Sequence, residues 1–96
     1  MLNSDLNFKL IAAGVVETRA NNFPQNAQYT FEIKNANIKS TDIVIATFFI
    51  KGTTAKGMYT RCLCADGIAR LIIYTTELIK DTNTYAGFNY VIFRLK

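Results

Sequence analysis

The chain has no histidine, and this absence removes the most common general base and the usual partner of a serine or cysteine nucleophile. No GxGxxG, GxxxxGK[ST] or GxSxG motif is present either. The seven acidic residues lie mostly at expected strand ends and turns, where solvation or turn capping accounts for them. We therefore expect no enzymatic activity, no catalytic residue and no cofactor.

Cysteine is almost absent as well, and the only two, Cys62 and Cys64, lie in the stretch RCLCAD. On a strand they would point to the same face about 6.5 to 7 Å apart, which is awkward for a disulfide between them. Two thiolates without any histidine supply at most half of a tetrahedral zinc site. We expect no bound metal, and we interpret both residues as small core thiols in a reducing compartment.

Long hydrophobic runs are also missing, since no apolar stretch approaches the roughly 18 to 20 residues of a membrane-spanning helix. The stretch LIAAGVV after Lys9 has the length of a short signal-peptide core. However, Asp5 lies where a signal peptide needs positive charge, and Phe8, Leu10 and Ala12 alternate as in a strand. We expect neither membrane attachment nor export.

The composition is that of a folding chain, because half of the residues are apolar and 12% are aromatic. Its length suits a single domain over residues 1–96. Eleven Lys and Arg against seven Asp and Glu give a net charge of +4, and the basic residues are spread along the chain. An evenly solvated surface explains this charge as well as an acidic partner does.

Hydrophobic residues recur with the period of β-strands almost throughout. The clearest case is QYTFEIK, which places Tyr29, Phe31 and Ile33 on one face. Asp66 and Gly67 predict a tight hairpin turn, and a bulge or bend is expected near Gly14. The stretches ANNFPQNAQ, NANIKSTD and ELIKDTNTYAG are expected to be loops or turns, the last with a possible helical turn at its start. Strands are expected near residues 7–18, 28–34, 42–50, 58–64, 68–76 and 88–96.

Six or seven short strands with regular turn signals predict an all-β fold. We expect a small antiparallel β-sandwich, with a small β-barrel as the alternative. The C-terminal stretch GFNYVIF is apolar enough to be paired inside a sheet. The stretch DIVIATFFI has β-branched and aromatic residues in both phases, which is typical of a strand covered on both faces.

A small OB-like module that binds single-stranded nucleic acid is an alternative, given a pI near 9.2, five tyrosines and seven phenylalanines. Two patterns count against it. Tyr29 and Phe31 share a face with Ile33, as core aromatics do. Tyr59 and Arg61 are predicted to lie on opposite faces of one strand, whereas a stacking platform needs both on one face. We therefore do not expect nucleic acid as a partner.

Three stretches resemble a known group of proteins: FKLIAAGVVET, NIKSTDIVIATFF and KDTNTYAGFNYVIFRLK. They are similar to the small β-sandwich modules of tailed-bacteriophage virions, found at tail-fibre ends and in head fibres or capsid decoration proteins. In that group a Ser- or Thr-rich turn precedes a strand, as in NIKSTDIVIAT. A final D-T-x-T turn there leads into an aromatic strand that ends the chain, and the similar residues here are Asp81, Thr82, Thr84, Asn89, Tyr90, Val91 and Ile92.

This resemblance implies a non-enzymatic virion protein, most simply a capsid decoration, minor capsid or head-fibre component assembled in the host cytoplasm. A tail-fibre or receptor-binding module is the alternative. Because the chain begins with Met and contains only the domain, we expect a free-standing head protein rather than a long fibre. The implied partners are other virion proteins and copies of the same chain, with three as the preferred number.

Two strands, DIVIATFFI and FNYVIFRLK, carry apolar residues on both faces. A two-layer sandwich covers only one face of each sheet, and a chain of 96 residues has too little material to cover both. We therefore predict an assembly interface on the second face, most simply between copies of the chain. The candidate interface residues are Val91, Phe93, Leu95, Phe48 and Ile50.

Overall fold

The computed structural model describes residues 7–23, 25–51, 58–76 and 84–95, and this part of the chain contains no α-helix. The all-β prediction is confirmed. The elements in chain order are β1 (Phe8–Arg19), the 3-10 helix η1 (Ala20–Asn22), β2 (Ala27–Lys34), β3 (Ile43–Lys51), β4 (Met58–Ala65), β5 (Ile68–Thr75) and β6 (Tyr85–Leu95). The expected connection ELIKDTNTYAG was predicted too long, because β6 already begins at Tyr85; its first part, residues 77–83, where a helical turn was considered, lies outside the described residues.

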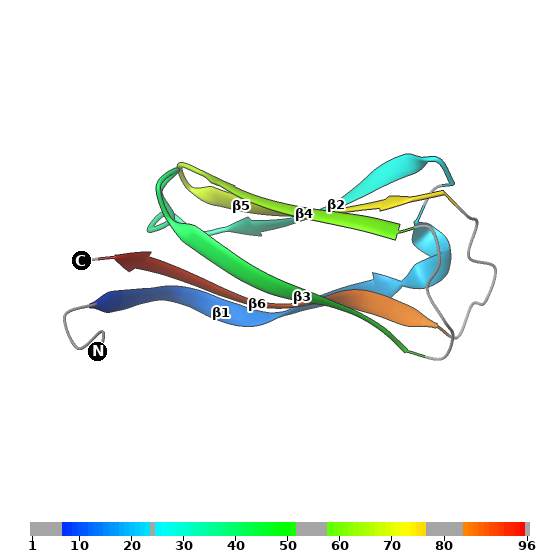
Figure 1. Cartoon of the computed structure of the whole chain (residues 1–96), viewed down its shortest axis with the longest axis horizontal. Helices are drawn as coiled ribbons and strands as arrows, with labels where there is room; N and C mark the ends of the chain where they lie inside the picture. The colour runs from blue at the N-terminus through cyan, green and yellow to red at the C-terminus, as the bar shows by residue number, and fades with distance from the viewer. Residues whose placement is uncertain (1–6, 24, 52–57, 77–83, 96) are drawn as a thin grey trace, which may run out of the picture.

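The strands form two antiparallel sheets of three, in the orders β1-β6-β3 and β2-β5-β4. The sheets are stacked as two layers, and the start of β1 and the end of β6 lie at the same end of the molecule (Figure 1). The described strands thus make the sandwich rather than the alternative barrel. The C-terminal strand β6 is the centre of its sheet, which confirms that GFNYVIF is paired on both sides.

The core lies between the inner faces of the two sheets. Phe88 of β6 is 1% exposed, and its ring meets Phe31 of β2 at 6.1 Å and Phe48 of β3 at 5.7 Å between centroids. Leu71 and Ile73 of β5 are fully buried in the same cluster. Edge-to-face contacts of this kind add to the burial of the rings, so the aromatic residues join the two layers.

A β-bulge in β1 decides which of its side chains reach the core. The register shifts between Leu10 and Ala12, three residues before the expected bend at Gly14. Because one extra residue reverses the phase of a strand, Phe8 and Leu10 point away from the core whereas Ala12 points into it. The expectation of a bulge near Gly14 was therefore wrong in position.

Gly14 has a different role, because it pairs with Tyr90 and lies beneath that ring. A Cβ at Gly14 would lie 3.0 Å from the Tyr90 hydroxyl oxygen. Gly87 allows a closer approach, since its Cβ would lie 1.8 Å from the carbonyl oxygen of Val16 in β1. The pairing of β1 with β6 therefore depends on a residue without a side chain at this position.

Two turns form where the sequence predicted them. Gly67 has a φ of 81° in the hairpin turn after Asp66 that joins β4 to β5. The backbone N–H of Asn37 donates to Oδ1 of Asn35 at 2.9 Å, and the N–H of Lys39 donates to Oδ2 of Asp42 at 2.9 Å.

The sequence predicted that strand β3 would be covered on both faces, and this prediction was wrong. Its inner face packs on the core, but Ile45 on the outer face is 60% exposed. The strand also forms an edge of its sheet. Apolar residues in both phases therefore indicate an uncovered apolar face here, and not a strand enclosed within the chain.

Candidate functional site

The outer face of the sheet β1-β6-β3 is apolar at the end where β6 finishes. We call this surface the apolar face; its large residues are Phe8, Leu10, Val15, Ile43, Ile45, Val91, Phe93 and Leu95. Leu10 and Ile43 both pair with Phe93, and Ile45 pairs with Val91, so the side chains form continuous rows across three strands. Leu10 is 66% exposed and Leu95 is 52% exposed.

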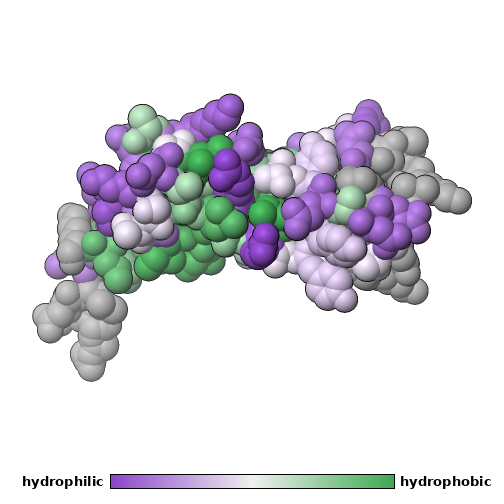
Figure 2. All heavy atoms as spheres, turned by 90° about the horizontal axis from the view of Figure 1, so that it is seen from above, coloured by the Kyte–Doolittle hydropathy of each residue, from purple (hydrophilic) through white to green (hydrophobic). Residues whose placement is uncertain are grey.

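The apolar face contains a shallow hollow of about 370 Å³ lined by Phe8, Leu10, Val91 and Phe93. The rings of Phe8 and Phe93 meet edge to face with their centroids 5.2 Å apart. Figure 2, seen from the side of the sheet β2-β5-β4, shows hydrophobic side chains gathered along one edge of the half of the molecule where β1 begins and β6 ends, and mostly polar ones over the other half. Contiguous exposed apolar surface on a small protein marks an interaction site.

Charged residues bound the apolar face at the other end of the same sheet. Lys51 and Glu17 form an ion pair at 3.6 Å, and the Lys51 ammonium also lies 5.3 Å from the ring centroid of Phe49. The Arg19 guanidinium lies 5.2 Å from the ring centroid of Tyr85. The surface thus has an apolar centre beside a polar rim, as protein interfaces have.

The structure brings together three of the five predicted interface residues. Val91, Phe93 and Leu95 lie on the apolar face. Phe48 and Ile50 do not, because they are in the opposite phase of β3 and pack against the core. The prediction was wrong for these two residues.

Five residues of the apolar face were missed by the sequence prediction: Phe8, Leu10, Val15, Ile43 and Ile45. Once Phe48 is assigned to the core, the period of two places Ile43 and Ile45 on the outer face, so the sequence contains that signal. Phe8 and Leu10 join the face only through the bulge. A run of apolar residues in β1 does not reveal where such a bulge lies.

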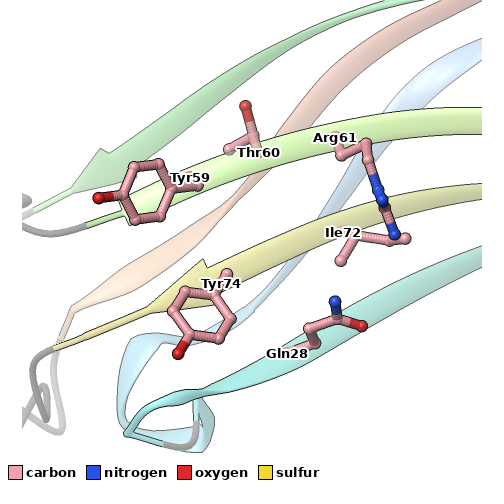
Figure 3. A pocket seen from close by; sticks show the side chains of 6 residues that line it. All are labelled: Gln28, Tyr59, Thr60, Arg61, Ile72 and Tyr74. Carbon is pink, nitrogen blue, oxygen red and sulfur yellow. The ribbon is translucent and has the colours of Figure 1, made fainter.

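A second candidate lies on the outer face of the other sheet, at the end where β5 finishes. We call it the tyrosine pocket; it has a volume of about 260 Å³ and is lined by Gln28, Tyr59, Thr60, Arg61, Ile72 and Tyr74 (Figure 3). Tyr59 pairs with Tyr74 across β4 and β5, and their ring centroids are 6.2 Å apart. The side chain of Arg61 reaches across from β4 toward Ile72.

Tyr59 and Arg61 share this pocket, so the prediction that they lie on opposite faces was wrong. Residues two apart on a strand point to the same face, and Tyr59 and Arg61 are two residues apart on β4. The correction removes one objection to nucleic-acid binding. However, Arg70 on the same face is paired with Glu32 at 3.3 Å, so among the described strands of this sheet only Arg61 and Lys34 remain as unpaired cations for a chain of phosphates.

Cys62 and Cys64 are free thiols that lie half-buried on the inner phase of β4. Burial raises the pKa of both thiols above the ordinary value, because the thiolate loses solvation. Within the four described segments, no three His, Cys, Asp or Glu side chains are grouped so that they could hold a metal ion.

The most strongly perturbed charged pair is Asp42 with Arg94. Nε of Arg94 donates to Oδ1 of Asp42 at 2.6 Å, and a terminal nitrogen donates to Oδ2 at 2.9 Å. The same guanidinium donates to the carbonyl oxygen of Asn37 at 2.7 Å. The hydrogen bonds from Arg94 lower the pKa of Asp42 to about 2. This pair joins the end of β6 to the turn before β3, which is a structural role.

Comparisons with known proteins return no match: no family model, no curated protein and no solved structure is similar to the chain. None of the described segments contains a helix that is long and apolar enough to cross a membrane. The two outer surfaces of the sandwich therefore carry the functional argument.

Proposed function

We propose that the chain is a non-enzymatic structural protein that assembles through the apolar face, as a capsid decoration, minor capsid or head-fibre component of a bacteriophage virion. The observation that carries the proposal is the apolar face itself, where Leu10 is 66% exposed and Ile45 60% exposed. The assignment to a virion rests on the resemblance of three sequence stretches to virion modules. A tail-fibre module would use the same surface in the same way.

The partner that we propose for the apolar face is a second copy of the chain. The residues at its centre carry no charge, while ion pairs lie beyond it on the same sheet, so two copies can meet apolar centre to apolar centre. A patch that meets its own copy gives a two-fold interface, whereas a ring of three needs the patch to contact a different surface of the next copy. The number three rests on the resemblance alone.

The test is the oligomeric state of the purified chain, measured by sedimentation and light scattering over a concentration series. We expect an oligomer that Phe93→Asp and Leu10→Asp convert into folded monomers. Burial of one large apolar side chain is worth about 1.5 to 3 kcal/mol, so each change should weaken association about 10- to 150-fold. Leu10 is the safer position, because its exposure leaves the fold little affected.

The matched control is Thr30→Asp, which introduces the same charge at an exposed position on the outer face of the other sheet. This variant should remain an oligomer. A wild-type chain that stays monomeric at the highest concentration would contradict self-assembly. The virion role has its own test, because mass spectrometry of purified particles should find the chain in stoichiometric copy number, and its absence there would contradict that role.

A further inference from the structure

The tyrosine pocket lies on the sheet that the proposed assembly does not use. No side-chain hydrogen bond or ion pair joins Arg61 or Gln28 to any residue in the described segments. Tyr59 is 66% exposed, although a tyrosine on a sheet surface could pack down on its neighbours. The pocket therefore presents a free guanidinium, a free amide and two aromatic rings to solvent.

The arrangement of these groups is amphipathic. In Figure 3 the rings of Tyr59 and Tyr74 lie side by side with their broad faces toward the viewer. Arg61 extends past Ile72 in the direction of Gln28, so the polar groups lie beside the rings and not behind them. A ligand held here would place an apolar flat surface on the rings and its polar groups against the guanidinium and the amide.

From this geometry we infer that the tyrosine pocket binds an acidic sugar residue, a uronic acid unit of a polysaccharide. One face of a pyranose ring carries C–H groups that suit the tyrosine rings. Its carboxylate matches the planar fork of Arg61, which can donate two parallel hydrogen bonds. Its hydroxyls both donate and accept, as does the side-chain amide of Gln28.

The charges around the pocket distinguish this ligand from single-stranded nucleic acid. The charged residues on the outer faces of the described strands of this sheet are Glu32, Lys34, Arg61 and Arg70. Arg70 is neutralised by Glu32, and Lys34 lies at the far end of β2 from Gln28. Among the described residues, Arg61 is the one unpaired cation beside the rings, which suits one carboxylate, whereas a nucleic acid chain needs a groove with several cations.

The experiment is a titration of the whole chain with a trisaccharide of galacturonic acid, followed through the amide chemical shifts of the protein. We expect shifts at Tyr59, Arg61 and Tyr74. Arg61→Gln should weaken binding about ten-fold or more, the effect of losing hydrogen bonds to a charged group. Tyr59→Ala should weaken it about two- to ten-fold. A neutral trisaccharide of glucose should bind more weakly and should be insensitive to Arg61→Gln.

Lys34→Gln is the matched control, because it removes a cation from the same face without touching the pocket, and it should leave the titration unchanged. Oligothymidylate is the competing probe. Tighter binding of oligothymidylate at about 150 mM salt would overturn the inference in favour of nucleic acid. Absence of shifts with the acidic trisaccharide, or shifts that persist in both pocket variants, would overturn it as well. Neither result depends on the oligomeric state of the chain.

Discussion

The outer faces of the two sheets differ, although their inner faces are built alike. In β2, Gln28, Thr30, Glu32 and Lys34 alternate with inward apolar residues, so one face is polar and the other is core. In β6, outward Val91, Phe93 and Leu95 alternate with Tyr90 and Ile92, which pack inside, and with Arg94, which pairs with Asp42. The outer face of β2 needs no partner other than water. The apolar sheet carries more hydrophobic surface than the fold uses, and this excess is the sign of an interface.

The largest effect is expected at the contact between β1 and β6, where Gly87 lets the two backbones approach closely. Gly87→Ala would place a methyl group 1.8 Å from the Val16 carbonyl oxygen, which belongs to the backbone and cannot rotate away. We expect the free energy of unfolding to fall by more than about 3 kcal/mol, or the chain not to fold. Urea unfolding followed by circular dichroism would measure it.

Gly14→Ala is the control for this prediction. Its methyl group would meet the hydroxyl end of Tyr90 at 3.0 Å, and that side chain can shift. A loss of about 1 kcal/mol or less is expected. Equal losses at the two glycines would mean that close backbone approach does not decide the pairing of β1 with β6.

The next effect concerns the inner face of the sheet β2-β5-β4. Cys62→Ser with Cys64→Ser should lower the free energy of unfolding by about 1 to 3 kcal/mol, because hydroxyls replace half-buried thiols. Assembly should be intact, since neither residue touches the apolar face. Denaturant unfolding and light scattering on the same samples would test both parts. A double variant that unfolds at the wild-type midpoint would show that the thiols contribute no packing.

Substitutions on the two outer faces should affect stability least. Ile45→Thr with Val91→Thr keeps β-branched residues at paired, exposed positions, so the isolated fold should change by less than about 1 kcal/mol. Association should nevertheless weaken, because both residues lie on the apolar face. Chemical unfolding of the monomeric variant, compared with wild type at dilution, separates the two effects. A large loss of monomer stability would mean that the outer face contributes to the fold itself.

Much of the fold follows from the alternation of apolar and polar residues along the strands and from the residues that favour turns. QYTFEIK predicted the inner face of β2, and the turn at Asp66 and Gly67 predicted the hairpin. A two-residue turn also sets the register, so the pairing of Tyr59 with Tyr74 can be counted from it. The place of Gln28 in the tyrosine pocket could not be predicted in this way. Strand β2 is distant in sequence, and packing decides which strand it pairs with.

The apolar face was predictable in part. The alternation of β6 indicates Val91, Phe93 and Leu95, but the phase of β3 depends on which of its two apolar sets reaches the core. Phe48 reaches it because Phe88 lies opposite on the neighbouring strand, a pairing between distant segments. The bulge between Leu10 and Ala12 has no local signal, since the residues around it are all apolar.

The ion pairs of the two sheets differ in how far water reaches them. Arg94 and Asp42 form a two-pronged pair in which the Asp42 side chain is fully covered, whereas Arg70 and Glu32 are about two-fifths exposed at 40% and 43%. The first pair should give the fold a measurable dependence on acid. Exposed pairs are screened by solvent and contribute little.

The pKa of Asp42 is lowered from 3.8 to about 2 in the folded chain, so the unfolded chain takes up the proton first as the pH falls. The stabilisation by Asp42 is therefore fully present above about pH 4 and is lost as the pH falls toward 2. Unfolding curves between these values should shift to lower denaturant for wild type and for Arg70→Gln. In Asp42→Asn this contribution to the shift should disappear, because the amide does not titrate. If Asp42→Asn lost stability with acid as steeply as wild type does, other carboxylates would govern the acid response. The covered pair at the end of β6 would then hold the strand in place without sensing pH.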